Sequence, residues 1–366
     1  MRSQEDQVWY HVDVNSAYLS WTAAYRVCIL GEDLDLRDIP SVIGGSEAER
    51  HGIVLAKSGS AKRYGIRTGE TLAEARCKCP GLVIVPPDYS LYVGCSKALV
   101  ELLKKYFPHV HQYSIDEAFC RVEGTKGLWG THTAFAHQLK EEIRRELGFT
   151  VNIGVSDCKL LAKMASEFQK PDQVHTLFTR EIERKMWPLP VSDLFWVGPA
   201  TVRKLGALGI RTIGELAVMD LELLKRHLKK QGEFIWNYAN GRDVSPFLRE
   251  LPRNKGYGNS MTTPFDVTDR ETAWQVILSL TETVCARLRA DGMEAACVGI
   301  SITDREFRHG SVQTTLISAT DTTLEIYEAA RSLFDRLWNH SPIRQMGVHT
   351  SKVSPKGHYQ YQLFDR

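Results

Sequence analysis

The first half of the chain alternates strand and helix patterns in an order that few folds satisfy. Strand-forming residues fill 7–12, 110–115 and 118–122, and residues 149–155 alternate between apolar and polar side chains. Apolar residues at helical spacing mark 99–106, before the second strand, and 135–147, before the last. The order strand, helix, strand, strand, helix, strand predicts a ferredoxin-like α+β sheet, with about seventy residues inserted after the first strand.

This topology brings together carboxylates that are far apart in the sequence. The first and third strands of the fold are central, adjacent and antiparallel, so the end of the first strand lies beside the hairpin that precedes the third. Asp13 occupies the former position, and Asp116 and Glu117 occupy the latter. Converging carboxylates repel one another unless a cation neutralises them, and hard oxygen ligands suit Mg²⁺, with Mn²⁺ as a substitute. Taken singly, each half could instead be a hairpin turn or a strand end.

The composition is typical of a globular intracellular protein, and it does not identify a ligand. The 366 residues exceed one ordinary core, so two to four domains are expected. The 46 basic and 44 acidic residues leave a net charge of +2, so any nucleic-acid contact must be local. The polar N-terminus, the absence of a long apolar run and eight scattered cysteines favour a soluble, cytoplasmic chain with reduced thiols and no membrane partner.

Two motifs then point to a known family. Residues 11–18 (HVDVNSAY) and 114–119 (SIDEAF) resemble the two catalytic motifs of the Y-family translesion DNA polymerases, most closely the bacterial DNA polymerase IV branch. The resemblance covers essentially the whole chain and implies a right-hand polymerase. It implies a palm at 1–19 and 85–172, fingers at 20–84, a helix-hairpin-helix thumb at 173–250, an α/β little finger at 251–359 and a tail at 360–366.

The resemblance also implies a two-metal site in the palm. Asp13, Asp116 and Glu117 match the family's catalytic carboxylates, and Val14 matches a position whose backbone carbonyl also binds metal. Two Mg²⁺ ions held there would activate the primer 3′-hydroxyl and steady the triphosphate. Many family members carry a second aspartate where this chain has Asn15, and Asn15 is not counted as a ligand.

Nucleotide contacts are implied at three positions. Tyr18 matches the aromatic residue that rejects ribonucleotides, and Lys62 and Lys170 match basic residues that bind the triphosphate. The family's usual fingers tyrosine is replaced by Gly59. That departure leaves Lys57 or Ser58 as possible substitutes for the missing contact.

The second half of the chain is expected to bind rather than catalyse. Gly198, Ala200, Arg203 and Lys204 fall in the helix-hairpin-helix that would contact DNA phosphates. The C-terminal tail carries Gln360, Leu363 and Phe364, which resemble a sliding-clamp-binding peptide. An ordinary final strand or tail explains those residues equally well.

The sequence therefore predicts an error-tolerant, template-directed DNA polymerase. Its expected partners are primer-template DNA, deoxynucleoside triphosphates and the sliding clamp, and it is expected to act as a monomer. Two alternatives stay open, namely a DNA-binding relative with little polymerase activity and a nucleotidyl cyclase-like enzyme. The substitutions at Asn15 and Gly59 motivate the first, whereas the predicted thumb and little finger speak against the second.

Overall fold

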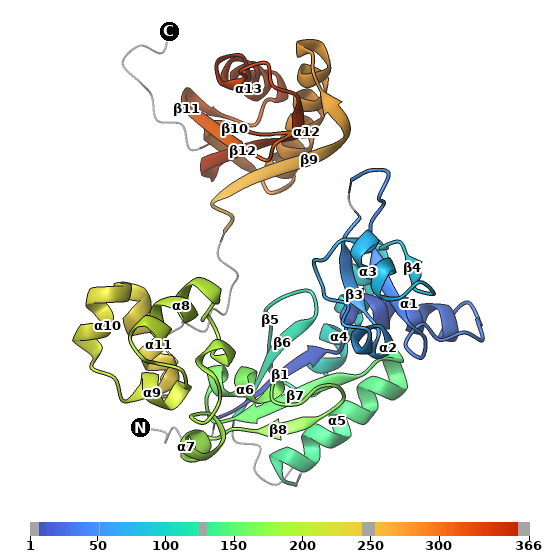
Figure 1. The fold of residues 1–366 in the computed structure, drawn as a ribbon, viewed down its shortest axis with the longest axis vertical. Coiled ribbons are helices and arrows are strands. Elements are labelled where there is room, and N and C mark those ends of the chain that lie inside the picture. The colour runs from blue at the N-terminus through green and yellow to red at the C-terminus, as the bar shows by residue number, and fades with distance from the viewer. Residues whose placement is uncertain (1–6, 51, 124–129, 244–252, 358–366) are drawn as a thin grey trace. The chain divides into compact units, whose positions relative to one another are not determined.

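The computed structural model describes residues 7–50, 52–123, 130–243 and 253–357 (Figure 1). The chain divides into two units. The N-terminal unit comprises Met1–Gly44 and Ile53–Arg249, and the C-terminal unit comprises Gly45–Gly52 and Glu250–Arg366. Each has its own hydrophobic cores, so each is described separately.

A five-stranded sheet forms the centre of the N-terminal unit. Its order is β5-β6-β1-β7-β8, from β1 (Gln7–Val14), β5 (His109–Gln112), β6 (Glu117–Glu123), β7 (Val151–Ser156) and β8 (Val174–Thr176). The first four strands have the ferredoxin-like order that the sequence predicts, and β8 adds a strand parallel to β7. The bounds differ in detail: β1 extends through Asp13, and β5 ends three residues before the expected Ile115.

Helices cover the sheet and complete its core. These are α1 (Ala17–Cys28), α4 (Tyr89–Lys104), α5 (His132–Leu147) and α6 (Lys159–Ser166). Thr131 caps the start of α5 by accepting from the Ala134 amide, and Gly148 ends it in the left-handed conformation. The alternating strand residues and the apolar helix stripes meet in one buried cluster that includes Tyr10, Val12, Trp21, Leu139 and Ile153.

Most of the insertion after α1 belongs to the same unit and has a small hydrophobic core apart from that of the five-stranded sheet. It contains a three-stranded sheet in the order β3-β2-β4, from β2 (Ser41–Gly44), β3 (Val54–Lys57) and β4 (Val83–Val85). Two helices accompany it, α2 (Gly59–Arg63) and α3 (Leu72–Lys78). Thr71 and Glu74 form a reciprocal capping box at the start of α3.

A helical segment follows the sheet. It contains α7 (Ile182–Lys185), α8 (Pro199–Ala207), α9 (Ile213–Ala217), α10 (Leu221–Leu228) and α11 (Lys230–Ala239). The α8–turn–α9 pair gives the predicted helix-hairpin-helix, with Gly209 at φ +79° in the turn. Its core includes Leu205, Ile213 and Leu224 and is continuous with Leu161 of α6.

The C-terminal unit packs two helices against a four-stranded antiparallel sheet. The strand order is β11-β10-β12-β9, from β9 (Gly256–Val267), β10 (Met293–Asp304), β11 (His309–Thr320) and β12 (Ile343–Pro355). The helices are α12 (Arg270–Ala290) and α13 (Thr323–Leu337). This agrees with the α/β little finger expected from the sequence. Among the described residues, no helix combines the length and the hydrophobicity needed to cross a membrane.

Gly154 allows α6 to lie directly on the sheet, and its replacement tests that packing. A Cβ at this position would lie 1.9 Å from the carbonyl oxygen of Ala162 and 2.6 Å from the amide nitrogen of Ser166. Both atoms belong to the backbone, so Gly154→Ala is expected to lower the free energy of unfolding of the N-terminal unit by about 2 kcal/mol.

Chemical denaturation would measure this loss. The matched control is Gly94→Ala in α4, where a Cβ would meet nothing within 4 Å. Because alanine favours helix, the control is expected to gain about 0.5–1 kcal/mol. Equal stability of the two variants would contradict the close packing of α6 on β7.

Candidate active site

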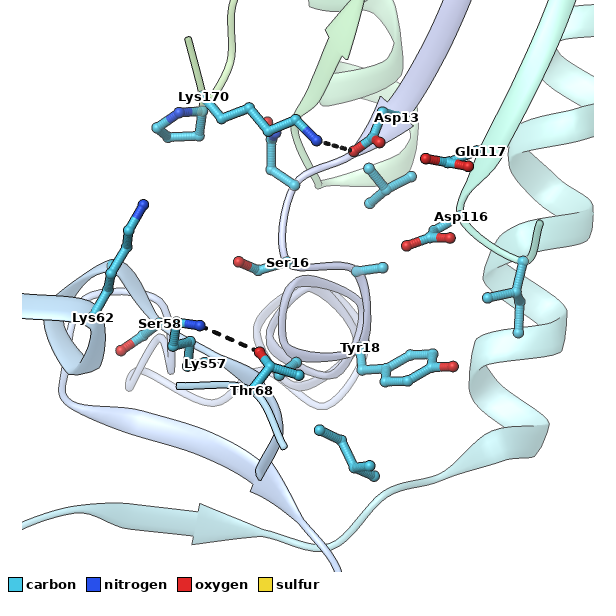
Figure 2. A pocket seen from close by; sticks show the side chains of 18 of the residues that line it. Asp13, Ser16, Tyr18, Lys57, Ser58, Lys62, Thr68, Asp116, Glu117 and Lys170 are labelled. Atoms are coloured by element: carbon cyan, nitrogen blue, oxygen red, sulfur yellow. Dashed lines mark hydrogen bonds and ion pairs between the residues drawn. The ribbon is translucent and has the colours of Figure 1, made fainter. Parts of the chain in front are cut away.

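A pocket of about 620 Å³ lies in the N-terminal unit, where the end of β1 faces β3 and α2 (Figure 2). Acidic residues approach it from β1, from the start of β6 and from the end of α6. Basic residues approach it from the β3–α2 segment and from the segment after α6. The predicted site residues that line it are Asp13, Val14, Tyr18, Lys62, Asp116, Glu117 and Lys170.

Strand register places two of the carboxylates opposite each other. Asp13 on β1 pairs with Glu117 on β6, as the predicted topology requires. Asp116 comes one residue before β6 and also lines the pocket. Its Oδ1 accepts a hydrogen bond of 2.7 Å from the Ser114 hydroxyl, and its backbone oxygen accepts one from the Val14 amide.

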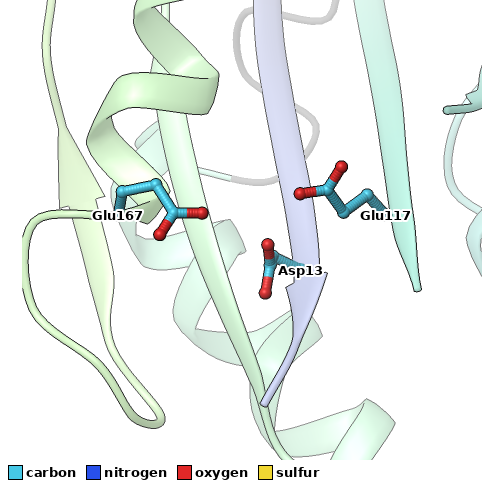
Figure 3. A group of neighbouring side chains, drawn as sticks. All are labelled: Asp13, Glu117 and Glu167. Atoms are coloured by element: carbon cyan, nitrogen blue, oxygen red, sulfur yellow. The ribbon is translucent and has the colours of Figure 1, made fainter. Parts of the chain in front are cut away.

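Three of the acidic side chains could share one cation. One carboxylate oxygen from each of Asp13, Glu117 and Glu167 lies within 4.8 Å of the others (Figure 3). Asp116 does not belong to this closest group. Hard oxygen donors in such a cluster fit a divalent ion of the Mg²⁺ or Mn²⁺ type.

The sequence interpretation did not include Glu167, which follows α6 as its C-cap. The one available signal was its spacing, since Glu167 precedes Lys170 by three residues and the two form an ion pair of 2.8 Å. That spacing is common on protein surfaces. The packing of α6 against β1 and β7 brings Glu167 to the carboxylates of Asp13 and Glu117.

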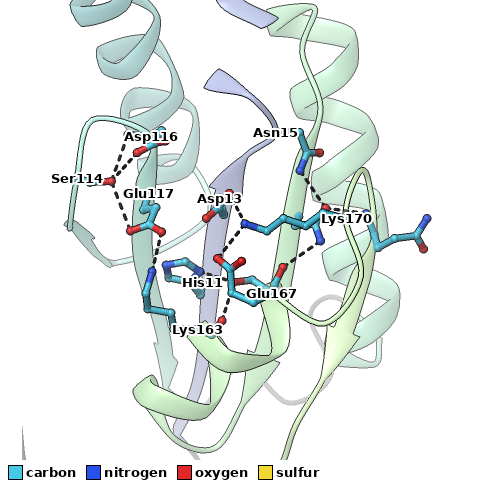
Figure 4. Close-up of polar contacts among 12 residues, drawn as sticks. His11, Asp13, Asn15, Ser114, Asp116, Glu117, Lys163, Glu167 and Lys170 are labelled. Carbon is cyan, nitrogen blue, oxygen red and sulfur yellow. Dashed lines mark hydrogen bonds and ion pairs between the residues drawn. The ribbon is translucent and has the colours of Figure 1, made fainter. Parts of the chain in front are cut away.

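Two lysines neutralise this acidic cluster (Figure 4). The ammonium of Lys170 lies 3.0 Å from Asp13 Oδ1, as well as contacting Glu167. The ammonium of Lys163 lies 2.6 Å from Glu117 Oε1. Lys170, expected to bind phosphate, is therefore paired with the carboxylates in this structure.

Burial controls the ionisation of Asp13. Loss of solvent raises the pKa of Asp13 to about 7, and the neighbouring Lys170 ammonium opposes this rise without cancelling it. Burial alone would lower the pKa of Lys170, but Asp13 and Glu167 outweigh it and raise that pKa. Burial thus disfavours the charged form of Asp13, and a cation beside the carboxyl group favours that form.

Asn15 uses its side chain to join segments of the fold. Its amide nitrogen donates to Asn152 Oδ1 at 3.1 Å. Its oxygen accepts from the Thr150 hydroxyl and from the Asp172 amide. Asn15 also lines the pocket, next to Val14.

Tyr18 lies near the start of α1, and its ring is held in place beside the pocket. It stacks on Tyr92 with a centroid distance of 4.5 Å and an interplanar angle of 15°. Tyr92 is fully buried and its hydroxyl lies 3.2 Å from Thr22 Oγ1. The pocket therefore has a rigid aromatic edge on the side of Asp116, as Figure 2 shows.

The opposite side of the pocket is basic. Lys57, at the end of β3, donates to Thr68 Oγ1 at 3.2 Å, and Lys62 lies on α2. Burial, and then the nearby charge of Lys62, lower the pKa of Lys57. A Cβ added at Gly59 would meet no atom within 4 Å, so the position of the family's usual tyrosine is open space.

The predicted DNA-binding residues are not part of this pocket. Gly198 is the N-cap of α8, followed by Pro199 at its first position. Gly198, Ala200, Arg203 and Lys204 are all exposed. The predicted clamp-binding residues, Gln360, Leu363 and Phe364, fall outside the described part of the chain.

Comparisons with known proteins agree with this arrangement. Residues 12–167 match the impB/mucB/samB family, and residues 254–363 match the C-terminal domain of the same family. The chain is 45% identical over 360 residues to a protein named DNA polymerase IV from Clostridium acetobutylicum, covering 98% of this chain and 90% of that protein. A DNA polymerase IV of Acetivibrio thermocellus is 39% identical, with coverage of 95% and 86%.

A solved structure supports the fold independently. A Y-family DNA polymerase chimera superposes with a TM-score of 0.80, covering 95% of this chain and 99% of its own. The sequence identity of that pair is 18%. The shared fold is therefore recognisable where most side chains differ.

Proposed function

The chain belongs to the impB/mucB/samB family, within the Y-family DNA polymerases of the DNA polymerase IV type, and on this premise we propose how it copies a template. It extends a primer by transferring a nucleotidyl group from a deoxynucleoside triphosphate to the primer 3′-hydroxyl. Lesion bypass fits this family. The observation that carries the proposal is the convergence of Asp13, Asp116 and Glu117 on one pocket that also holds Lys62 and Lys170.

Metal binding is assigned to the acidic side of the pocket. Asp13, Asp116 and Glu117, with the backbone carbonyl of Val14, would hold two divalent ions, of which Mg²⁺ is proposed. When bound, such ions lower the pKa of the primer hydroxyl and neutralise the departing pyrophosphate. Glu167 is close enough to Asp13 and Glu117 to contribute negative charge beside the same ions.

The basic side is assigned to the triphosphate. Lys62 lines the pocket from α2, and Lys170 is paired there with Asp13 and Glu167. We propose that Lys170 leaves these carboxylates for the triphosphate when the metal ions bind. A lysine there draws negative charge from the leaving group. The stacked ring of Tyr18 is assigned to exclude a nucleotide that carries a 2′-hydroxyl.

DNA contacts are assigned to the exposed part of α8. Gly198 and Ala200 place the start of this helix in solvent, and Arg203 and Lys204 add positive charge along it. Such contacts reach phosphates and read no sequence. Pro199 has no amide hydrogen, so this hairpin offers one donor fewer.

Primer extension on a defined template tests the proposed function. The wild-type protein is expected to add the complementary deoxynucleotide when Mg²⁺ is present and to add nothing in EDTA. Template-directed addition would exclude a cyclase, which needs no template. DNA binding without extension at any concentration of Mg²⁺ or Mn²⁺ would favour the alternative of a DNA-binding relative.

Sliding-clamp binding is proposed for the C-terminal tail. Paired apolar side chains on an extended tail can fill a groove on a partner. Deleting 360–366 is expected to abolish stimulation by the clamp and to leave basal extension unchanged, measured as product length with and without clamp. Loss of basal extension would mean instead that the tail completes the little finger. A monomer in the cytoplasm remains the expected state of the protein.

A further inference from the structure

We propose that Lys163 is a positioning residue that holds Glu117 from the side away from the pocket and connects it to Phe195 of the thumb segment. This inference rests on the proposed function, because Glu117 matters as a ligand of the catalytic ions. Lys163 carries a buried charge, and none of the proposed nucleotide or DNA contacts involves it.

The first step concerns the direction from which Lys163 approaches. Its ammonium lies 2.6 Å from Glu117 Oε1, and the two side chains are only 9% and 15% exposed. Lys170 lines the catalytic pocket, but Lys163 is absent from the described residues that do so. Figure 4 shows Lys163 reaching Glu117 from the side opposite to Ser114 and Asp116, so Lys163 contacts Glu117 from outside the lining of the pocket.

The second step concerns what fixes Lys163. Its ammonium lies 5.3 Å from the centre of the Tyr113 ring and 4.9 Å from that of Phe195. Both distances are in the range of cation–π attraction, which is stronger where water is excluded. Tyr113 is itself tied to the catalytic strand, because its amide donates to the backbone oxygen of Glu117 at 2.9 Å.

The third step compares the two lysines of the site. Lys170 is 32% exposed and lies against Asp13 and Glu167 within the pocket, so a cation that binds there displaces it. Lys163 is enclosed by rings, and breaking a buried ion pair by removing one partner is costly. Lys163 is accordingly expected to stay on Glu117 while the other carboxylate oxygen turns to the metal.

The fourth step connects this pair to the thumb segment. Phe195 packs against the thumb core that includes Val197 and Leu205, and its ring also contacts Tyr113 at 6.3 Å. The ring therefore touches both the lysine and the turn that carries the catalytic carboxylates. A shift of the segment before α8 would change how firmly Glu117 is held.

The test replaces Lys163 by methionine, which keeps the apolar stem and removes the charge. The matched control is Lys159→Met, one turn earlier on α6, where the ammonium lies 4.7 Å from the Phe119 ring. Mn²⁺ binding to each protein without DNA is measured by the paramagnetic resonance signal of the free ion. The rate of single-nucleotide incorporation at saturating Mn²⁺ is measured separately.

Removing the cation makes the carboxylate cluster more negative and leaves Glu117 free to turn. Lys163→Met is therefore expected to bind Mn²⁺ about threefold more tightly, yet to incorporate nucleotide about tenfold more slowly at saturation. Lys159→Met should match the wild type in both measurements. Unchanged Mn²⁺ affinity, a rate within twofold of wild type, or the same changes in Lys159→Met would overturn the proposal.

Phe195→Leu tests the link to the thumb and remains informative if Lys163→Met does not fold. It should change Mn²⁺ affinity and rate in the same directions by smaller factors, and should add nothing to Lys163→Met in the double variant. Additive effects would refute the link. If the wild-type protein extends no primer, the proposed function fails. The Mn²⁺ titrations alone still decide whether Lys163 affects metal binding at the carboxylates.

Discussion

Replacing Asp116 by asparagine together with Glu117 by glutamine is expected to reduce single-nucleotide incorporation by at least about 10³-fold. The amides keep the volume of the side chains and remove both charges that would hold the ions. Both residues line the pocket, and Glu117 lies opposite Asp13 in the strand register. The affinity for primer-template DNA should stay within about threefold of wild type, because the proposed DNA contacts lie on α8.

A control variant separates this effect from a general change in charge. Glu101→Gln with Glu146→Gln removes two carboxylates that are 69% and 51% exposed on α4 and α5. It is expected to incorporate nucleotide at the wild-type rate. A catalytic variant that keeps more than a tenth of the wild-type rate would contradict the assignment. So would a parallel loss of DNA affinity, because the defect would then lie in binding.

Replacing Tyr18 by alanine is expected to reduce discrimination against ribonucleotides by about 10²-fold, which corresponds to about 2.7 kcal/mol. The ring is fixed by its stack on Tyr92, so it cannot move aside cheaply for a 2′-hydroxyl. Alanine removes that obstacle. The measurement compares kcat/KM for dCTP and CTP opposite a template guanine.

Tyr18→Phe keeps the ring and removes the hydroxyl, so it serves as the matched control. It should discriminate as the wild type does, because the proposed exclusion is steric. Unchanged discrimination in Tyr18→Ala would refute the assignment of Tyr18 as the residue that excludes ribonucleotides. An equal loss in Tyr18→Phe would show that the hydroxyl, and not the ring, rejects the ribonucleotide.

The sequence was most informative where the order of strands and helices alone determines which residues lie close together. The order of strands and helices predicted that Asp13 would lie beside the Asp116–Glu117 hairpin, and the register of β1 with β6 confirms it. Alternation of apolar and polar residues identifies a strand but not its neighbours in the sheet. The neighbours can be predicted only when the order of all the strands and helices is known. That order could be identified because strand patterns and helix patterns follow one another clearly along the first half of the chain.

The contacts made by long side chains could not be predicted in this way. Lys163 and Lys170 each reach a carboxylate from another element, at separations in sequence of 46 and 157 residues. Such pairs depend on how α6 packs on the sheet, where Gly154 permits a close approach. The position of Glu167 beside Asp13 and Glu117 was missed for the same reason.

Local departures from a motif were visible in the sequence, but their structural meaning was not. Gly59 leaves open space at the position where the family usually has a tyrosine, and Lys57 borders the same pocket. Asn15, in contrast, donates one hydrogen bond to Asn152 and accepts two at its side-chain oxygen. Both positions line the pocket, but Gly59 leaves space there, whereas the Asn15 side chain connects β1 to β7 and to the segment after α6.

Single-turnover incorporation on templates that differ in one base tests the central claim most directly. With Mg²⁺, the wild-type protein should add the nucleotide complementary to each template base. It should form no product in EDTA, and the rate should fall at least about 10³-fold in the Asp116→Asn, Glu117→Gln variant. Addition that ignores the template base, persists in EDTA, or proceeds equally in the variant would contradict a metal-dependent polymerase site at Asp13, Asp116 and Glu117.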